Sequence, residues 1–192
     1  MEGLKQHRSL WPSKGRSVPG VNQNIFFWDL PNNAESRPIA GLSACNLAEA
    51  EAVASLTKWL LLCGCPPASI SIITPYKGQK TAITQALRKK NCLTPFRRDQ
   101  AAPPRGTTLT VSTVDRYQGD ENDIIILSLV RCNPGNRFVA LKNRFVVAVS
   151  RARLGFFVIG SVKAVTTNRN DSDGPAHWQR FTKSLKDSTR DG

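Results

Sequence analysis

Three short polar segments, each beside an apolar run, contain the residue types needed to bind a nucleotide or a nucleic acid. They are, in chain order, T-P-Y-K-G-Q from Thr74, T-V-D-R-Y-Q-G-D-E-N-D-I-I-I-L-S-L-V-R from Thr113, and N-R-F-V-V-A-V-S-R-A-R from Asn143. In the second segment, Gly119 permits close backbone approach, Gln118 can both donate and accept, and Glu121 is an acceptor suited to ribose hydroxyls. A solvated turn is the alternative interpretation of these three residues. Together, the three segments indicate one site.

The first and third segments indicate different ligands. Thr74, Tyr76 and Lys77 combine a hydroxyl, a ring and a cation, the set expected where a single strand is held by its backbone and one or two bases. A place in the core is the alternative for Tyr76. Arg151, within S-R-A-R, can set a forked, permanently charged guanidinium beside a phosphate that another domain supplies. A purely structural role is the alternative for Arg151, whereas Arg153 is expected to anchor the fold or a backbone phosphate.

A complete catalytic centre for phosphate hydrolysis is not encoded in this sequence. The dipeptide Gly-Lys occurs nowhere, so there is no G-x-x-x-x-G-K-[ST] loop to bind phosphates and magnesium, and G-x-G-x-x-G is also missing. Asp120 and Glu121 precede their apolar strand, whereas a magnesium-binding Asp of the Walker type follows one. Cys63 and Cys65 lack histidines at zinc-ligand spacing, so no metal site is predicted. The segments therefore suit the second half of a split nucleotide site.

Changes of hydrophobic period predict the elements that position these segments. Strands are expected over 24–30, 69–74, 107–111, 123–130 and 154–159, and helices over 46–63, 78–90 and 142–153. Asn46 and Glu49 resemble a capping box, and Phe145, Val146 and Val149 are expected to face inward. A short docking helix is expected around Trp178, Phe181 and Leu185. The alternation predicts a mainly parallel sheet covered on both faces, with the ligand at the carboxyl ends of its strands.

Composition narrows the class of partner and the compartment. The 192 residues suit one domain, and 27 basic against 14 acidic residues give a net charge of +13. Such a charge predicts a polyanionic partner, above all nucleic acid, with a soluble basic surface or a ribosome-like environment as alternatives. The five cysteines are odd in number and no signal peptide opens the chain, which favours reduced thiols in the nucleus or cytoplasm and argues against secretion. The apolar runs are far shorter than the roughly 20 residues that span a bilayer, so no membrane contact is expected.

The three polar segments resemble motifs IV, V and VI of superfamily 1 helicases in the up-frameshift-like branch, in order and in spacing. Y-Q-G-D-E-N-D, S-L-V-R and G-V-N-Q-N-I-F-F-W look most like the NFX-type zinc-finger-containing helicases. The resemblance covers roughly Asn24 to Gly160. It implies the second RecA-like domain of an ATP-dependent RNA helicase, an α/β three-layer sandwich with a mainly parallel sheet and no P-loop of its own. The expected organisation is a connecting segment over 1–23, the RecA-like domain over 24–162 and a polar tail over 163–192.

The resemblance also implies roles for individual residues. Arg151 resembles the motif VI arginine finger, and Glu121 with Gly119 the motif V nucleotide contact. Thr74 and Thr113 resemble RNA-backbone contacts. Gln6-His7-Arg8 resembles the Q-[YH]-R signature that opens this domain, which makes Arg8 a second candidate phosphate contact, although S-L-W-P follows where the family usually has M-[HR]-P.

Cofactor and partners follow from the same resemblance. ATP with Mg²⁺ would be shared with a missing N-terminal RecA-like domain, supplied in cis or in trans. The implied partners are single-stranded RNA and, for that subfamily, a small-RNA silencing or RNA-directed RNA polymerase complex. The implied process is heterochromatin formation or RNA surveillance. The implied location is the nucleus or cytoplasmic RNA granules. The isolated chain is expected to have no ATPase activity. The alternative is a non-catalytic RNA-binding or scaffold module, or a truncated helicase fragment.

Overall fold

A computed structural model of the chain describes residues 17–30, 43–93, 108–117, 119–132, 142–167 and 176–188. Two of the predicted nucleotide contacts, Arg8 and Gln118, lie outside the described residues, so their roles remain predictions.

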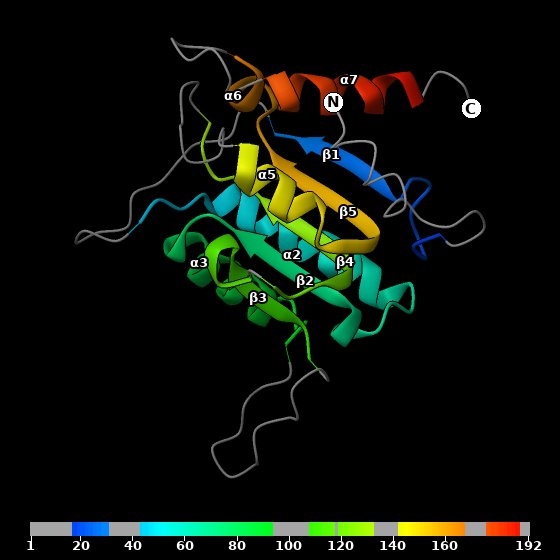
Figure 1. Cartoon of the computed structure of the whole chain (residues 1–192). Helices are drawn as coiled ribbons and strands as arrows, with labels where there is room; N and C mark the ends of the chain where they lie inside the picture. The colour runs from blue at the N-terminus through cyan, green and yellow to red at the C-terminus, as the bar shows by residue number, and fades with distance from the viewer. Residues whose placement is uncertain are drawn as a thin grey trace.

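Five strands form one sheet in which every neighbouring pair is parallel (Figure 1). The strands are β1 (Ile25–Asp29), β2 (Ile70–Thr74), β3 (Thr110–Thr113), β4 (Asn122–Ser128) and β5 (Ala152–Gly160). Their order across the sheet is β1-β5-β4-β2-β3. The central strands β4 and β2 are almost entirely buried, as expected for a parallel sheet that is covered on both faces.

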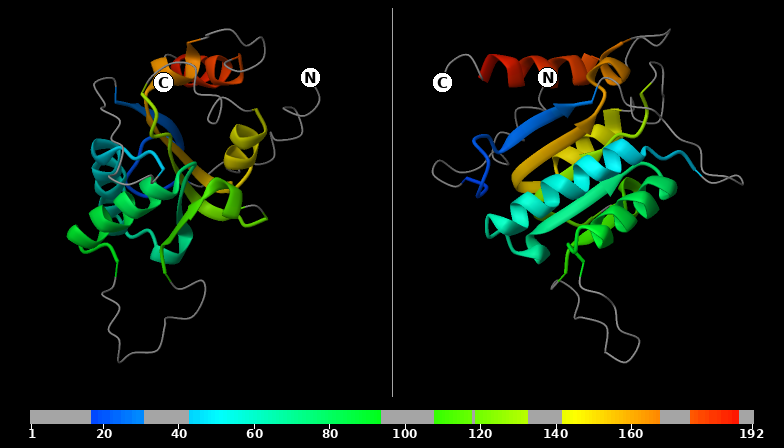
Figure 2. Two further views of the ribbon diagram at one scale, coloured as in Figure 1. Left: turned by 90° about the vertical axis from the view of Figure 1, so that its left-hand side faces the viewer. Right: turned by 180° about the vertical axis from the view of Figure 1, so that it is seen from behind.

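Helices cover the two faces of this sheet. Within the described residues they are α2 (Leu47–Leu62), α3 (Lys77–Lys89), α5 (Lys142–Val149), α6 (Val162–Thr166) and α7 (Ala176–Ser188), together with the 3₁₀ turns η2 (Pro67–Ser69) and η3 (Val114–Tyr117). Figure 2 shows the sheet between α2 and α3 on one side and α5 on the other. The predicted RecA-like α/β sandwich is therefore confirmed by the parallel sheet and its flanking helices.

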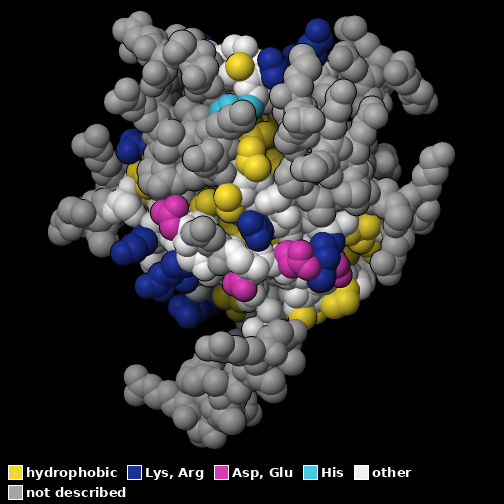
Figure 3. All heavy atoms as spheres, in the orientation of Figure 1, with side chains coloured by type: hydrophobic (Ala, Val, Ile, Leu, Met, Phe, Trp, Pro, Cys, Tyr) yellow, Lys and Arg dark blue, Asp and Glu magenta, His cyan; other side chains and the backbone are white. Residues whose placement is uncertain are grey.

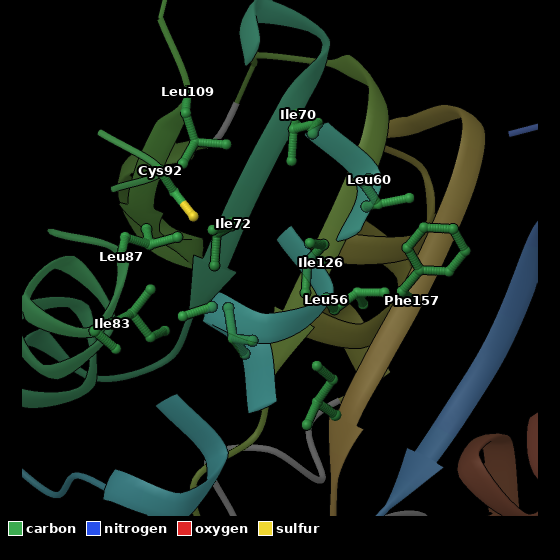
Figure 4. Packing of buried hydrophobic residues seen from close by; sticks show 14 of the residues in the cluster. Leu56, Leu60, Ile70, Ile72, Ile83, Leu87, Cys92, Leu109, Ile126 and Phe157 are labelled. Atoms are coloured by element: carbon green, nitrogen blue, oxygen red, sulfur yellow. The ribbon is translucent and has the colours of Figure 1, made fainter. Parts of the chain in front are cut away.

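Alternate residues of the central strands point into two separate cores. Ile124 and Ile126 of β4 belong to the core beneath α2 and α3, which Figure 4 shows from close by. Ile125 and Leu127 belong to the second core, beneath α5 and α7. Because successive side chains of a strand point to opposite faces, one apolar strand fills both cores.

The helix α7 belongs to the second core rather than projecting from it. Trp178 is only 1% exposed, and its ring lies edge-on to the rings of Phe145 and Phe27, with centroids 4.5 and 6.2 Å away. Phe181 packs against the same group, with its ring centroid 5.4 Å from that of Phe145. The predicted docking helix is thus present. The predicted division of the chain into 1–23, 24–162 and 163–192 remains a prediction.

Three details of the predicted elements are wrong. The helix expected over 142–153 ends at Val149, so Arg151 lies in a turn and Arg153 in β5. The strand expected over 107–111 lies three residues later at its start, at Thr110–Thr113. Val146, expected to face inward, is 38% exposed. The apolar second half of α5 is followed closely by an apolar strand, so no change of periodicity marks where the helix ends.

Candidate nucleotide and nucleic-acid site

The predicted nucleotide contacts meet where β4 and β5 begin. Gly119 and Glu121 immediately precede β4, and Arg151 immediately precedes β5. The two loops are joined at this point, because the backbone N–H of Asn122 donates to the carbonyl of Arg151 at 2.9 Å. Nη1 of Arg151 lies 3.5 Å from the carbonyl oxygen of Asp120. The structure therefore brings Gly119, Glu121 and Arg151 together at the amino edge of the sheet.

Arg151 is held in place but retains an unused donor. Its Nε is buried and has no hydrogen-bond partner among the described residues. A buried N–H without a partner is costly, and an anionic ligand would supply the missing acceptor. Gly119 has a φ of +95°, and a methyl group added there would meet no atom within 4 Å, so open space borders its backbone. An anionic group approaching these loops would fit both observations.

Arg153 takes the structural role predicted for it. Its Nε donates to Oδ1 of Asp123 at 3.0 Å, and its Nη1 lies 3.5 Å from Oε1 of Glu121. These three side chains are about half exposed, so the pairs contribute little to stability but fix the orientation of Glu121. The carboxylate predicted to accept from a ribose is therefore already paired with a cation.

The other predicted contacts lie at the opposite end of the sheet. Thr74 ends β2 and pairs with Thr113, which ends β3. Tyr76 follows as the N-cap of α3, and Lys77 is the first residue of that helix. β4 spans seven residues, so its two ends lie about 20 Å apart. The expectation that all the ligand-binding residues lie at the carboxyl ends is thus wrong for Gly119, Glu121 and Arg151, which lie at the amino ends. The prediction that the three polar segments form one site is wrong for the same reason.

At the carboxyl ends, Tyr76 and Lys77 are accessible, whereas both threonines are buried. Thr74 is 0% exposed, and its hydroxyl has no partner among the described residues, while Thr113 is 7% exposed. Direct contact with a ligand at this edge therefore falls to Tyr76 and Lys77 in this structure.

Arg131, just beyond β4, is a residue of this edge that sequence reasoning did not single out. Its guanidinium carbon lies 5.3 Å from the centroid of the Tyr76 ring, and its Nε donates to the Tyr76 hydroxyl at 3.3 Å. One face of the Tyr76 ring is therefore engaged by a cation. The signal was present in S-L-V-R, but only the fold brings that segment to Tyr76.

A buried polar cluster fixes the carboxyl end of β4. Oε1 and Oε2 of Glu49 accept from the backbone N–H groups of Leu129 and Val130, at 3.1 and 2.5 Å. Val130 has a φ of +76°, which is strained for a β-branched residue. The carboxyl of Glu49 thus holds in place the turn that leads to Arg131.

Asn46 and Gln79 complete this cluster and correct the predicted capping box. The side chain of Asn46 accepts from the N–H of Glu49 at 3.1 Å, as an N-cap should. The N–H of Asn46, however, donates to Oε1 of Gln79 at 2.7 Å, and not to Glu49. Nε2 of Gln79 also donates to Oγ of Ser128 at 3.0 Å. The cluster therefore ties α2, α3 and β4 together beneath the carboxyl edge.

Burial changes the protonation of Glu49. The carboxyl is fully buried, and desolvation raises its pKa from 4.5 to about 8, against the lowering effect of the hydrogen bonds from Val130, Leu129 and Ser128. At neutral pH Glu49 is therefore mostly protonated and can occupy a buried position without an ionic partner.

We expect a methyl group at Gly160 to disturb this cluster. In Gly160→Ala the new Cβ would lie 2.8 Å from Oε1 of Glu49 and 2.8 Å from Cβ of Leu129. Overpacking of this kind costs about 1 to 3 kcal/mol in the free energy of unfolding, measured by denaturant titration. The cost should shrink when the same change is made in a Glu49→Ala background, and an equal cost in both backgrounds would contradict the contact.

The sequence of the chain identifies its family. The sequence profile of the AAA domain family matches residues 2–163. The chain belongs to this family. It is 31% identical over 193 residues to NFX1-type zinc finger-containing protein 1 of Mus musculus, an alignment that covers 100% of this chain and 9% of that protein.

Two further relatives are helicases by name. RNA helicase aquarius of Mus musculus is 42% identical over 117 residues, which are 61% of this chain and 7% of that protein. The helicase required for RNAi-mediated heterochromatin assembly 1 of Schizosaccharomyces pombe is 30% identical over 184 residues, 95% of this chain and 16% of that protein. The resemblance to superfamily 1 helicases is confirmed. The chain spans less than a fifth of the length of each of these three relatives.

The described residues contain neither a cluster of metal ligands nor a membrane-spanning helix. No group of three or more His, Cys, Asp and Glu side chains in those ranges is arranged to hold a metal ion. No helix in the same ranges is long and apolar enough to cross a membrane.

Proposed function

We propose that this chain is the second motor domain of an ATP-dependent RNA helicase, completing the ATP site of a preceding domain at one edge and holding single-stranded RNA at the other. The observation that supports this most is the separation of the two predicted sets of contacts onto opposite ends of one parallel sheet. A domain built this way can take part in two binding events without either ligand blocking the other.

At the amino edge, the proposed ligand is the phosphate end of ATP with its Mg²⁺. Arg151 would place its guanidinium, including the unpartnered Nε, beside the phosphates, while Gly119 lets the backbone approach closely. Glu121, oriented by Arg153, would accept from a ribose hydroxyl. ATP supplies the scissile phosphoanhydride and Mg²⁺ neutralises phosphate charge, and both would be held mainly by the phosphate loop of the preceding domain.

At the carboxyl edge, the proposed ligand is the RNA backbone with one or two bases. Lys77 is exposed and supplies a cation, and the Tyr76 ring offers a stacking surface beside Arg131. The net charge of +13 would attract RNA over longer range.

The strand β4 links the two edges physically. Glu121 precedes it and Arg131 follows its end, with the Glu49 cluster bracing the turn between Ser128 and Arg131. A shift of the amino edge on ATP binding or hydrolysis would therefore be carried to the RNA edge by one buried strand. That is the coupling a translocating motor needs.

The biological process that we propose rests on the named relatives and on the resemblance to NFX-type helicases. One relative is named for RNAi-mediated heterochromatin assembly and another as an RNA helicase. We propose small-RNA silencing or RNA surveillance, in the nucleus or in cytoplasmic RNA granules, with an RNA-directed RNA polymerase or silencing complex as a partner.

Binding of single-stranded RNA to the purified chain tests the RNA half of this proposal. Tyr76→Ala should weaken binding by about 1 to 3 kcal/mol through lost stacking. Lys77→Ala should lower the slope of log affinity against log salt by about 0.7, because one phosphate contact is lost. Lys163→Ala, an exposed lysine on α6, is the charge-matched control and should change little beyond general charge. Affinity unaffected by both Tyr76→Ala and Lys77→Ala would contradict an RNA site at this edge.

A further inference from the structure

One face of α3 is a continuous row of polar and basic side chains. The helix buries the opposite face against the core, through Gln79, Ala82, Ile83, Ala86 and Leu87. The row on the outer face, called here the α3 stripe, recurs at steps of three or four residues: Lys77, Thr81 and Arg88 are exposed, and Lys80 and Thr84 are half-buried. From Lys77 to Arg88 it is about 16 Å long. Figure 3 shows Lys and Arg side chains gathered over α3.

In the part of the chain that the structure describes, no carboxylate pairs with the basic side chains of the stripe. The helix contains no acidic residue. An ion pair of Lys90 with Glu51, at 3.4 Å, lies beyond the end of the stripe. Within the described part of the chain, Lys77, Lys80 and Arg88 form no ion pair. Their charges therefore face solvent.

Helix stability alone does not account for this placement. Cations are favourable in the last turn of a helix, where Arg88 and Lys89 lie. Lys77 and Lys80, however, lie at the N-terminus, where the helix dipole is positive and each cation is unfavourable. Two cations that oppose the dipole favour an anion held by their side chains, since the N–H of Gly78 already donates to Oγ of Ser43 at 2.7 Å.

The stripe continues the proposed RNA edge. Lys77 belongs to both, because it begins α3 directly after Tyr76. The hydroxyls of Thr81 and Thr84 donate to backbone carbonyls of their own helix, at 3.3 and 2.8 Å. The groups that remain for phosphates further along are the side chains of Lys80 and Arg88.

We propose that the α3 stripe extends the RNA path, with Lys80 and Arg88 contacting backbone phosphates of a single strand after it leaves Tyr76 and Lys77. This rests on the proposed function of the carboxyl edge. Contacts with phosphates alone would bind without regard to sequence and would lengthen the occupied site along the outer face of the domain.

The test compares two lengths of single-stranded RNA, about 5 and about 15 nucleotides, on the full chain. The double variant Lys80→Ala with Arg88→Ala should bind the short RNA as the unchanged chain does. For the long RNA, its slope of log affinity against log salt should fall by about 1.4, corresponding to two lost phosphate contacts. The control removes two exposed lysines elsewhere, Lys163→Ala with Lys183→Ala, and should leave the length dependence intact.

The outcomes separate this proposal from the one it rests on. Equal affinity of the unchanged chain for both RNA lengths, or an equal loss in the control, would overturn the α3 path while the edge site survives. A second outcome would also overturn the α3 path. In that outcome the double variant still binds the long RNA more tightly than the short one, whereas an acidic polypeptide removes this difference. Failure of the chain to bind either RNA would overturn both proposals together.

Discussion

Replacing Arg151 with alanine is expected to lower kcat for RNA-stimulated ATP hydrolysis by about 10³ to 10⁵ when this chain is joined to a first motor domain that carries a phosphate loop. The guanidinium would neutralise charge that develops on the transferred phosphoryl group, so its loss should affect kcat much more than KM. A chimera with the first motor domain of a relative provides the enzyme, and steady-state phosphate release is the measurement.

Two further variants make the Arg151 result specific. Arg151→Lys keeps the charge but loses the fork, so it should recover only part of the rate. Arg153→Ala should retain most of kcat, because that side chain is engaged with Asp123 and Glu121 rather than free to reach a phosphate. Equal losses in Arg151→Ala and Arg153→Ala would indicate a general disturbance of the amino edge.

Removing the Glu49 carboxyl is expected to lower the free energy of unfolding by about 1 to 3 kcal/mol. Glu49→Ala leaves the buried N–H of Val130 without its acceptor, at a cost of about 1 to 3 kcal/mol, whereas the N–H of Leu129 keeps the carbonyl of Ile159 at 3.1 Å. Chemical denaturation measures the loss, and Glu51→Ala, an exposed residue of the same helix, is the control. A loss no larger than that of the control would mean that Glu49 does not brace this turn.

The same carboxyl should make stability depend on pH. Because its pKa is raised from 4.5 to about 8 in the folded chain, the folded state binds one proton more than the unfolded state between these values. Stability should therefore be highest below pH 4.5 and fall as pH rises toward about 8, by at most about 1.4 kcal/mol per unit from this group. Glu49→Gln should remove this contribution, and identical pH slopes in the two proteins would contradict a raised pKa.

Apolar patterning was sufficient to predict the layered fold from the sequence. The continuous apolar run of β4 indicated a strand buried on both faces, and the helical spacing in α2 and α3 identified their buried sides. Local signals were weaker where two elements of similar composition meet. Nothing in V-A-V-S-R-A-R marks the point at which α5 ends, so Arg151 was assigned to a helix rather than to a turn.

The site was harder to predict because it depends on contacts between distant segments. Glu49 looked like half of a capping box, but its partners are 80 and 81 residues away in sequence. Arg131 and Tyr76 are separated by 55 residues and meet only because β4 and β2 are neighbours. The sequence showed which residue types could bind a ligand. Their division between the two edges of the sheet could be seen only once the direction and order of the strands were known.

The most direct measurement of the central claim is RNA-stimulated ATP hydrolysis by the chain alone and by the chimera with a phosphate-loop domain. The half-site account predicts no hydrolysis by the chain alone and hydrolysis by the chimera that Arg151→Ala removes. Robust hydrolysis by the chain alone that Arg151→Ala abolishes would contradict the account, as would chimera activity that does not depend on Arg151.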